Sequence, residues 1–207
     1  MNKKDIEVRN IGNIELRDLE SRHVEGYAVV FDSESQDMGF IEKIDRNAIT
    51  PDIIKKSDVF ALFNHNDDKV LARSRKGKGS LKLELDERGL HYSFDAPKTE
   101  LGNELLEYLQ RGDVFGSSFA FSVDWEDESA QSWEKRDGKT YRTIKKINRL
   151  YDVSPVFEPA YLKTNVSQRA LDKLEEIREQ ETLERVKEYD KMIEEIDKLN
   201  IDIDFNK

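Results

Sequence analysis

Alternation of apolar and polar residues dominates most of the chain and predicts β-strands. One β-rich run covers His23 to Phe31, and a second apolar run covers Asp58 to His65. The clearest hairpin is Ser80 to Ala96, where apolar and polar residues alternate on both sides of a turn at Asp86 to Gly89. Each arm of this hairpin therefore offers one apolar face to a core.

A second hairpin and one helix complete the elements predicted for this β-rich region. Asp137-Gly138 suits a tight primed turn that would join residues 133–135 to 140–147. Thr99 suits a helix N-cap and Gly112 a helix end. The apolar residues between them fall at helical spacing and predict a helix that faces the core: Leu101, Leu105, Leu106 and Leu109.

The pattern changes at about Thr164. Apolar residues now recur at spacings near three, four and seven, with Glu and Lys between them and neither Gly nor Pro. This predicts one long amphipathic helix, or two, with a narrow apolar seam that packs back on the β-rich region or pairs with another chain. We therefore expect two domains, 1–163 and 164–207. The seam consists of Leu171, Leu174, Ile177, Leu183, Val186, Ile193, Ile196 and Leu199.

Composition and charge exclude several classes of function. The 207 residues carry a formal net charge of −10, with a sequence pI of about 5.0, which argues against nucleic-acid binding as the main role. The absence of cysteine excludes a disulfide framework, a thiolate zinc site and a cysteine nucleophile. The charged stretch Met1 to Arg9 lacks the apolar run of a signal peptide, and the chain has no apolar run of about eighteen residues. We expect a soluble, intracellular protein.

Three histidines are available as a catalytic base. His23 lies beside charged residues, and His91 lies opposite the leucines of the first hairpin, so both are interpreted as surface residues. His65 ends an apolar strand and lies within the polar cluster Asn64 to Asp68. An imidazole at a strand end is held by a rigid element and open to solvent, which suits a proton carrier. A turn histidine in an Asn/Asp-rich loop is the alternative.

The segment Arg111 to Phe121 holds the candidate nucleophile. Small residues around Ser118 would let a substrate backbone approach and leave amides free to stabilise an oxyanion. Gly116-x-Ser118-x-Ala120 loosely resembles the nucleophile elbow of α/β-hydrolases, but that fold places its histidine after the serine. All three histidines precede Ser118 here. The alternative is a strand start with a glycine for close packing.

A third residue, an acid, would orient the imidazole and stabilise its protonated form. Asp152 lies in the β-rich run Leu150 to Val156, and alternation alone favours an outward-facing strand residue there. The histidine–aspartate–serine order of chymotrypsin-like proteases is also possible, with Asp67, Asp68 or Asp95 as the acid. Those proteases need two β-barrels, and the chain is short for two barrels plus its helical tail.

Together, these segments resemble the tailed-phage prohead (procapsid) maturation protease family, in matching order from about His23 to Thr164. Family members usually read Gly-x-Ser-Phe-Gly-Phe at the serine, a register that selects Ser118 over Ser117. Ala120 replaces a common glycine of the family, and Asp152 replaces its usual glutamate. The matching segments are Gly26 to Ser33, Glu42 to Ile44 with Ala48-Ile49, Ala61 to Asn66, Arg111 to Phe121, Asp152 to Ser154 and Pro159 to Tyr161.

The resemblance implies an α+β fold shared with herpesvirus assembly proteases. We expect a single, mainly antiparallel β-barrel flanked by helices, followed by the long amphipathic helix. Herpesvirus enzymes use a second histidine as the third catalytic residue. No histidine follows Ser118 in this chain, so an acid takes that position if a triad exists, and Asp152 is the candidate.

The resemblance also implies a serine endopeptidase with His65 as base, Ser118 as nucleophile and Asp152 as orienting acid, and no metal or organic cofactor. Its substrates would be the major capsid protein, scaffold segments and the protease itself. It would act inside a phage prohead in the host bacterial cytoplasm, as a possible homo-oligomer, without nucleic-acid or membrane partners. The alternative is a non-catalytic capsid assembly or scaffolding protein that uses the same fold.

Overall fold

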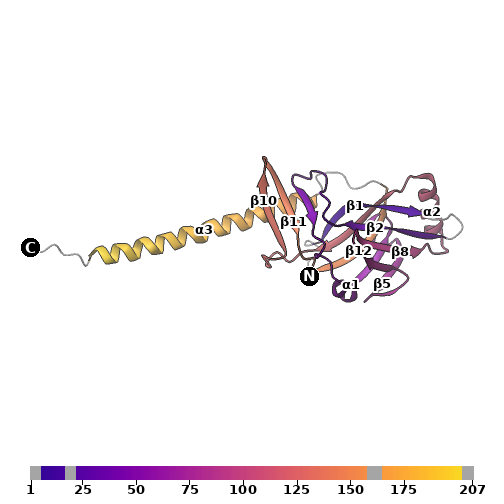
Figure 1. The fold of residues 1–207 in the computed structure, drawn as a ribbon, viewed down its shortest axis with the longest axis horizontal. Helices are drawn as coiled ribbons and strands as arrows, with labels where there is room; N and C mark the ends of the chain where they lie inside the picture. Colours follow the sequence, from indigo (N-terminus) through magenta and orange to yellow (C-terminus); the bar gives the residue numbers. More distant parts are fainter. Residues whose placement is uncertain (1–5, 17–21, 158–164, 202–207) are drawn as a thin grey trace, which may run out of the picture. The chain divides into compact units, whose positions relative to one another are not determined.

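The structure, a computed structural model, describes residues 6–16, 22–157 and 165–201 (Figure 1). Contacts between Cα atoms divide the chain into two compact units, Met1–Thr164 and Asn165–Lys207. Within the described ranges, no helix is long and apolar enough to cross a membrane. The first unit contains β1 (Glu7–Leu16), β2 (His23–Val30), β3 (Ile41–Ile44), α1 (Pro51–Lys56), β4 (Asp58–Leu62), the 3-10 helix η2 (Phe63–His65), β5 (Val70–Arg75), β6 (Lys78–Gly79), β7 (Lys82–Leu85), β8 (Gly89–Asp95), α2 (Glu100–Arg111), β9 (Gly116–Ser122), β10 (Gln131–Arg136), β11 (Lys139–Ile144) and β12 (Arg149–Val156).

Nine of the strands form one sheet in the order β6-β5-β4-β12-β9-β1-β2-β8-β7. Its pairs are antiparallel except for β12 with β4, which run parallel. Strand β9 lies near the middle, between β12 and β1, and all seven of its residues are buried. The predicted hairpin over Ser80 to Ala96 is confirmed as β7 and β8, which pair Leu83 with Tyr92 and Leu85 with Leu90.

The prediction of a closed barrel was wrong for the part of the chain that the structure describes. The nine-stranded sheet ends at β6 on one side and at β7 on the other, and no ladder joins these two edges. Only Ser80 and Leu81 separate the two edge strands in the chain, and the Leu81 amide donates to the Arg73 carbonyl at 3.1 Å. Both residues of β6 pair with β5, and the chain passes through Ser80 and Leu81 to β7 without a ladder between β6 and β7. The mixed α+β class and the predominance of strands were correct.

A smaller sheet has the order β10-β11-β3. Its β10–β11 hairpin confirms the turn predicted at Asp137-Gly138, where both residues have positive φ angles of 52° and 75°. Such angles match the twist of a two-residue hairpin turn. Strand β3 then pairs with β11 in parallel, so the small sheet combines residues that lie about a hundred positions apart.

Apolar side chains fill the interior of the first unit. Phe119 and Phe121 of β9 are fully buried and stack with ring centroids 4.8 Å apart. Fully burying one such side chain contributes about 1.5–3 kcal/mol. Other fully or nearly fully buried members of this core are Val24, Val29, Ile44, Val59, Leu90, Tyr92, Leu105, Leu150 and Val153.

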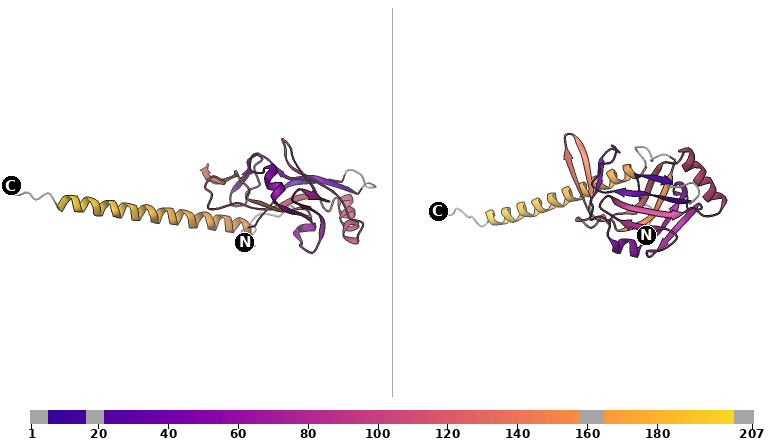
Figure 2. Two further views of the ribbon diagram at one scale, coloured as in Figure 1. Left: turned by 90° about the horizontal axis from the view of Figure 1, so that it is seen from below. Right: turned by 45° about the vertical axis from the view of Figure 1, so that its right-hand side comes forward.

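Helices α1 and α2 lie at the periphery of the first unit, around the strands (Figure 2). The predicted ends of α2 are confirmed: the Thr99 hydroxyl accepts a hydrogen bond from the Gly102 amide at 3.3 Å, and Gly112 closes the helix at φ 76°. Gly102 also packs so closely on the Pro97 carbonyl that an added Cβ would lie 1.9 Å from its oxygen. Leu105 is fully buried, so α2 presents its leucine face to the core as predicted.

Four buried charged residues, here called the charge cluster, connect the two sheets: Glu7, Arg9, Glu42 and Arg142. Arg9 of β1 donates to Glu7 at 2.7 Å and to Glu42 of β3 at 2.5 and 2.9 Å. Arg142 of β11 donates to Glu42 at 2.9 Å and to both oxygens of Glu7. Burial would raise the pKa of Glu7, but the charges and hydrogen bonds of the two arginines outweigh it and hold this pKa at about 2. The formal charges of the two arginines and the two glutamates cancel within the cluster.

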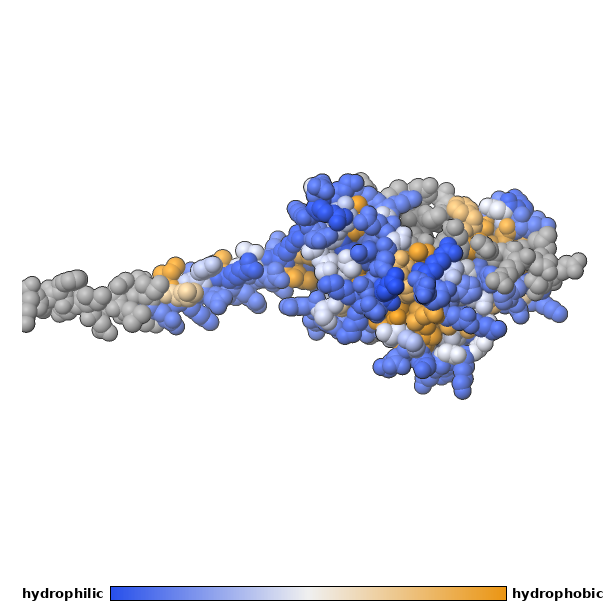
Figure 3. Space-filling view, viewed as in Figure 1, coloured by the Kyte–Doolittle hydropathy of each residue, from blue (hydrophilic) through white to orange (hydrophobic). Residues whose placement is uncertain are grey.

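The second unit contains one helix, α3 (Asn165–Ile201). The sequence left one helix or two open, and the structure shows one uninterrupted helix of 37 residues. Most of its surface is hydrophilic, with apolar patches between the charged side chains (Figure 3). From residue 178 to residue 195 all of its residues are exposed.

Candidate active site

His65 is presented by a short 3-10 turn at the end of β4. The predicted strand Asp58 to His65 stops at Leu62, and η2 follows. Asn64 and His65 both have positive φ angles, of 54° and 56°, which is uncommon for residues other than glycine. Phe63 is buried and fixes this turn, and its carbonyl accepts a hydrogen bond from the Asn66 amide. Backbone strain of this kind costs about 1–3 kcal/mol per residue and is concentrated at functional sites.

Ser118 lies in the middle of β9, opposite Asn10 of β1 and Ser154 of β12. Its hydroxyl oxygen is 2.5 Å from Nε2 of His65. The same oxygen is 3.0 Å from the carbonyl oxygen of Arg9. The hydroxyl has one proton for two acceptors, so it donates to either the imidazole or the β1 backbone. Ser118 has an exposed fraction of 0 %.

Ser117 and Ser118 face opposite sides of the sheet, as neighbours in a strand do. The Ser117 hydroxyl donates to the hydroxyl of Tyr92 at 3.1 Å, inside the core. Burial raises the pKa of Tyr92, so this phenol stays protonated. The arrangement separates the two serines: Ser118 reaches the imidazole, and Ser117 is part of the packing.

Asp152 completes a line of three side chains. Its Oδ1 atom is 2.7 Å from Nδ1 of His65. The Ser154 hydroxyl donates to the same Oδ1 atom at 2.6 Å. Asp152 is only 7 % exposed, so these two hydrogen bonds offset the cost of burying its charge. Ser154 had no role in the prediction from sequence, although residues two apart on a strand share a face of the sheet.

Irregular pairing surrounds the three side chains. Strand β12 shifts register against β9 between Leu150 and Asp152, and β1 shifts register against β9 between Asn10 and Gly12. A bulge bends the strand locally and changes the direction of nearby side chains. The register shift in β12 places Asp152 opposite Ala120 and Ser154 opposite Ser118, so Asp152 lies on the same face of the sheet as Ser118.

The remaining candidates lie elsewhere. Nδ1 of His23 is 2.9 Å from Asp95, and His91 packs edge-on against Tyr27 with centroids 5.2 Å apart. Asp95 therefore pairs with a different histidine from His65. The other two aspartates weighed for a chymotrypsin-like order, Asp67 and Asp68, are exposed.

The hydrogen bonds define the proton positions that this site can use. With Nδ1–H donated to Asp152, Nε2 carries the lone pair that accepts the Ser118 proton. The arrangement matches the nucleophile, base and orienting acid of an acyl-transfer site. Among the described residues, no three His, Asp or Glu side chains lie close enough together to hold a metal ion.

Comparisons with known proteins identify a similar solved structure and a similar family. A solved structure of the bacteriophage T4 capsid assembly protease, gp21, is similar with a TM-score of 0.49 and 10 % sequence identity, over 74 % of this chain and 98 % of that chain. None of the curated protein sequences matches significantly. The sequence profile of the caudovirus prohead serine protease family matches residues 7–180, most of the chain. The chain therefore belongs to the caudovirus prohead serine protease family.

Proposed function

We propose that this chain is an active serine endopeptidase of prohead maturation, with Ser118 as nucleophile, His65 as general base and Asp152 as orienting acid. The observation that supports the proposal best is the continuous line from Ser118 through His65 to Asp152, with contacts of 2.5 and 2.7 Å. A protein that used the same fold only as a scaffold would have no need of this geometry.

In the proposed reaction, Nε2 of His65 removes the Ser118 proton while the Ser118 oxygen attacks a peptide carbonyl carbon. The tetrahedral intermediate collapses, and His65 gives the proton to the departing amine, which leaves an acyl-enzyme. Water then attacks the ester, His65 takes the proton from that water, and Ser118 recovers its proton as the new carboxylic acid leaves. Asp152 stabilises the protonated imidazole in both halves of the cycle.

The substrates follow from family membership and remain part of the proposal. They are segments of the major capsid protein and of scaffold, together with the protease itself, and the reaction takes place inside the prohead. Assembly within a closed shell raises the local concentration of enzyme and substrate, so modest intrinsic activity suffices. Neither nucleic acid nor a membrane takes part, in keeping with the net charge of −10.

The test is co-expression with the capsid protein of the same phage, followed by intact mass measurement of both chains. Wild type should release discrete fragments, whereas Ser118→Ala and His65→Ala should not. Ser117→Ala is the matched control, because it removes a neighbouring hydroxyl on the opposite face of β9. Equal cleavage by Ser118→Ala and wild type would assign the cutting to another enzyme and favour the non-catalytic assembly role.

A further inference from the structure

Exposed large apolar side chains are concentrated on α3. Five of them have exposed fractions between 49 % and 65 %. Isolated apolar residues on a surface need no explanation, but a set that recurs along one helix indicates an interaction surface. The five are Leu183, Val186, Tyr189, Met192 and Ile193.

Three of these five residues have the spacing of a coiled-coil seam. Val186, Tyr189 and Ile193 follow one another at intervals of three and four, the a and d positions of a heptad. The sequence extends this spacing to Ile196 in one direction and Thr182 in the other. These positions return to one side of the helix and form a continuous stripe.

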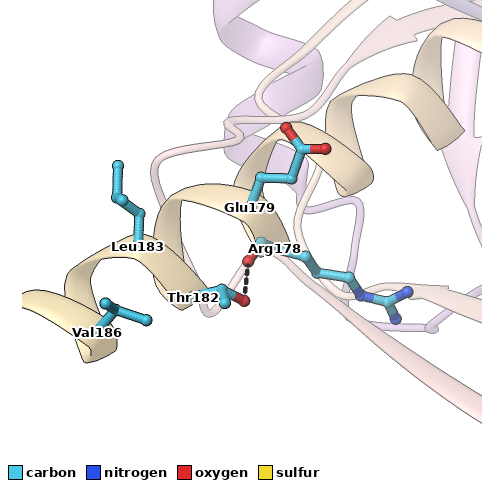
Figure 4. A pocket seen from close by; sticks show the side chains of 5 residues that line it. All are labelled: Arg178, Glu179, Thr182, Leu183 and Val186. Atoms are coloured by element: carbon cyan, nitrogen blue, oxygen red, sulfur yellow. Dashed lines mark hydrogen bonds between the residues drawn. The ribbon is translucent and has the colours of Figure 1, made fainter. Parts of the chain in front are cut away.

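Thr182 is compatible with burial in such a seam. Its hydroxyl donates to the Arg178 carbonyl at 2.8 Å, so the polar atom is already satisfied within the helix (Figure 4). Thr182, Leu183 and Val186 line a shallow hollow together with Arg178 and Glu179 (Figure 4). A hollow between seam residues is what a side chain of a facing helix occupies in knobs-into-holes packing.

The charges beside the seam select the partner and its direction. In the same heptad frame, Arg178, Arg185 and Met192 occupy g positions, whereas Leu183 and Asp190 occupy e positions. Two parallel copies place each g residue beside the next e residue of the partner, which pairs Arg185 with Asp190 twice across the dimer. Antiparallel copies place g beside g and e beside e, so arginines would meet arginines or apolar residues. The flanking charges of one copy are thus complementary to those of a parallel second copy.

We propose that α3 forms a parallel two-stranded coiled coil with α3 of a second copy of this chain. The seam has about two heptads of apolar positions, which is short for a stable coiled coil. Association is therefore weak and reversible, so dimers dissociate on dilution. The proposal concerns residues of α3 and does not depend on the proposed peptidase activity.

The first test measures the mass of the full chain in solution over a series of concentrations, in the Ser118→Ala background to prevent self-cleavage. The mass should rise from 24.2 kDa towards twice that value as concentration increases. Ile193→Lys should abolish the rise, whereas Glu188→Lys, at an outward position of the same helix, should not. Circular dichroism checks that both variants remain folded. A constant mass of 24.2 kDa at every concentration would overturn the proposal.

The second test determines direction and uses the absence of native cysteine. Val186→Cys and Ile193→Cys, made separately, should each form intermolecular disulfides under mild oxidation, because a positions of parallel helices face each other. An antiparallel dimer can link through at most one of the two positions, so efficient linkage of only one would refute the parallel arrangement. Glu188→Cys is the control for random collision.

Exchanging the charges of Arg185 and Asp190 tests whether these two residues pair across the dimer. Arg185→Asp should weaken dimerisation, and so should Asp190→Arg, because each places like charges together. The double variant should restore the mass of the dimer at the concentration where the single variants are monomeric. Failure of the double variant to recover would remove the charge argument for a parallel pair.

Discussion

The charge cluster and the candidate active site include residues of two neighbouring strands, β1 and β9, and they are built differently. The charge cluster contains two carboxylates and two guanidinium groups, each bonded to partners of opposite charge. The site contains one carboxylate, an imidazole and a hydroxyl, and the Ser118 proton has two acceptors. The four charges of the cluster neutralise one another and hold its side chains in place. The site instead contains a hydroxyl proton that can be donated to either of two acceptors. On the proposed function, the first set of groups stabilises the fold and the second set carries out the reaction.

The largest expected effect is on the site. Ser118→Ala should reduce peptide cleavage by at least about a thousandfold, because the nucleophile is lost and only binding and oxyanion contacts remain. The midpoint of thermal unfolding should change little, since a small hydroxyl is removed. Mass spectrometry of capsid protein incubated with the purified enzyme measures the loss of cleavage. A melting curve of the same variant measures the midpoint of thermal unfolding. A large drop in the melting temperature would show that Ser118 is a structural residue.

The opposite outcome is expected for the charge cluster. Arg142→Ala should lower the free energy of unfolding by about 3–5 kcal/mol, because it leaves Glu7 and Glu42 buried with one cation between them. Urea unfolding in the Ser118→Ala background measures this value. Arg73→Ala is the control, since Arg73 pairs with Asp58 at the surface and its loss should matter much less. Equal effects of the two substitutions would contradict the view that the cluster joins the sheets.

Acid should weaken the charge cluster over a defined pH range. Burial would raise the pKa of Glu7, but Arg142 and Arg9 hold it at about 2, below its ordinary value of 4.5. The unfolded chain therefore binds more protons than the folded chain between these values, and the stabilisation is lost as pH falls from 4.5 towards 2. Urea midpoints should be measured at pH 6, 4.5 and 3, and we expect the midpoint at pH 3 to be lower than the midpoint at pH 4.5. Glu7→Gln should be less stable at pH 6 and show a shallower decline.

The smallest predicted effect sharpens the description of the site. Ser154→Ala removes the second hydrogen bond to Oδ1 of Asp152, and we expect kcat to fall about tenfold, the equivalent of one buried hydrogen bond. KM should be unchanged, because Ser154 contacts the acid rather than the substrate. Ser154→Thr keeps the hydroxyl and should recover most of the rate. An equal loss in both variants would indicate a packing role instead.

Local patterns in the sequence were enough to predict the hairpins and the ends of α2. Each depends on residues within a few positions, such as the alternation around Asp86 to Gly89 or the positive φ angles at Asp137-Gly138. Closure of the sheet was not encoded locally. The prediction of a barrel failed because alternation within each strand does not specify which strands pair, and the observed order leaves β6 and β7 as separate edges.

The site was predicted unevenly. Resemblance to the prohead proteases identified His65, Ser118 and Asp152, and the structure brings these three side chains together, while their roles remain predictions. Ser154 and the Arg9 carbonyl were missed, since their contacts depend on a bulge and on the register between strands distant in sequence. The charge cluster was missed for a similar reason: Glu7 and Arg142 are 135 positions apart.

Arg9 takes part in both buried systems. Its guanidinium group lies in the charge cluster, and its backbone oxygen lies beside Ser118. A slip of β1 by one residue would turn the guanidinium to the opposite face of the sheet and move the carbonyl away from the hydroxyl at the same time. Only one alignment of the N-terminal strand therefore satisfies both demands. A deletion or an insertion between residues 7 and 10 would therefore disturb the charge cluster and the surroundings of Ser118 together.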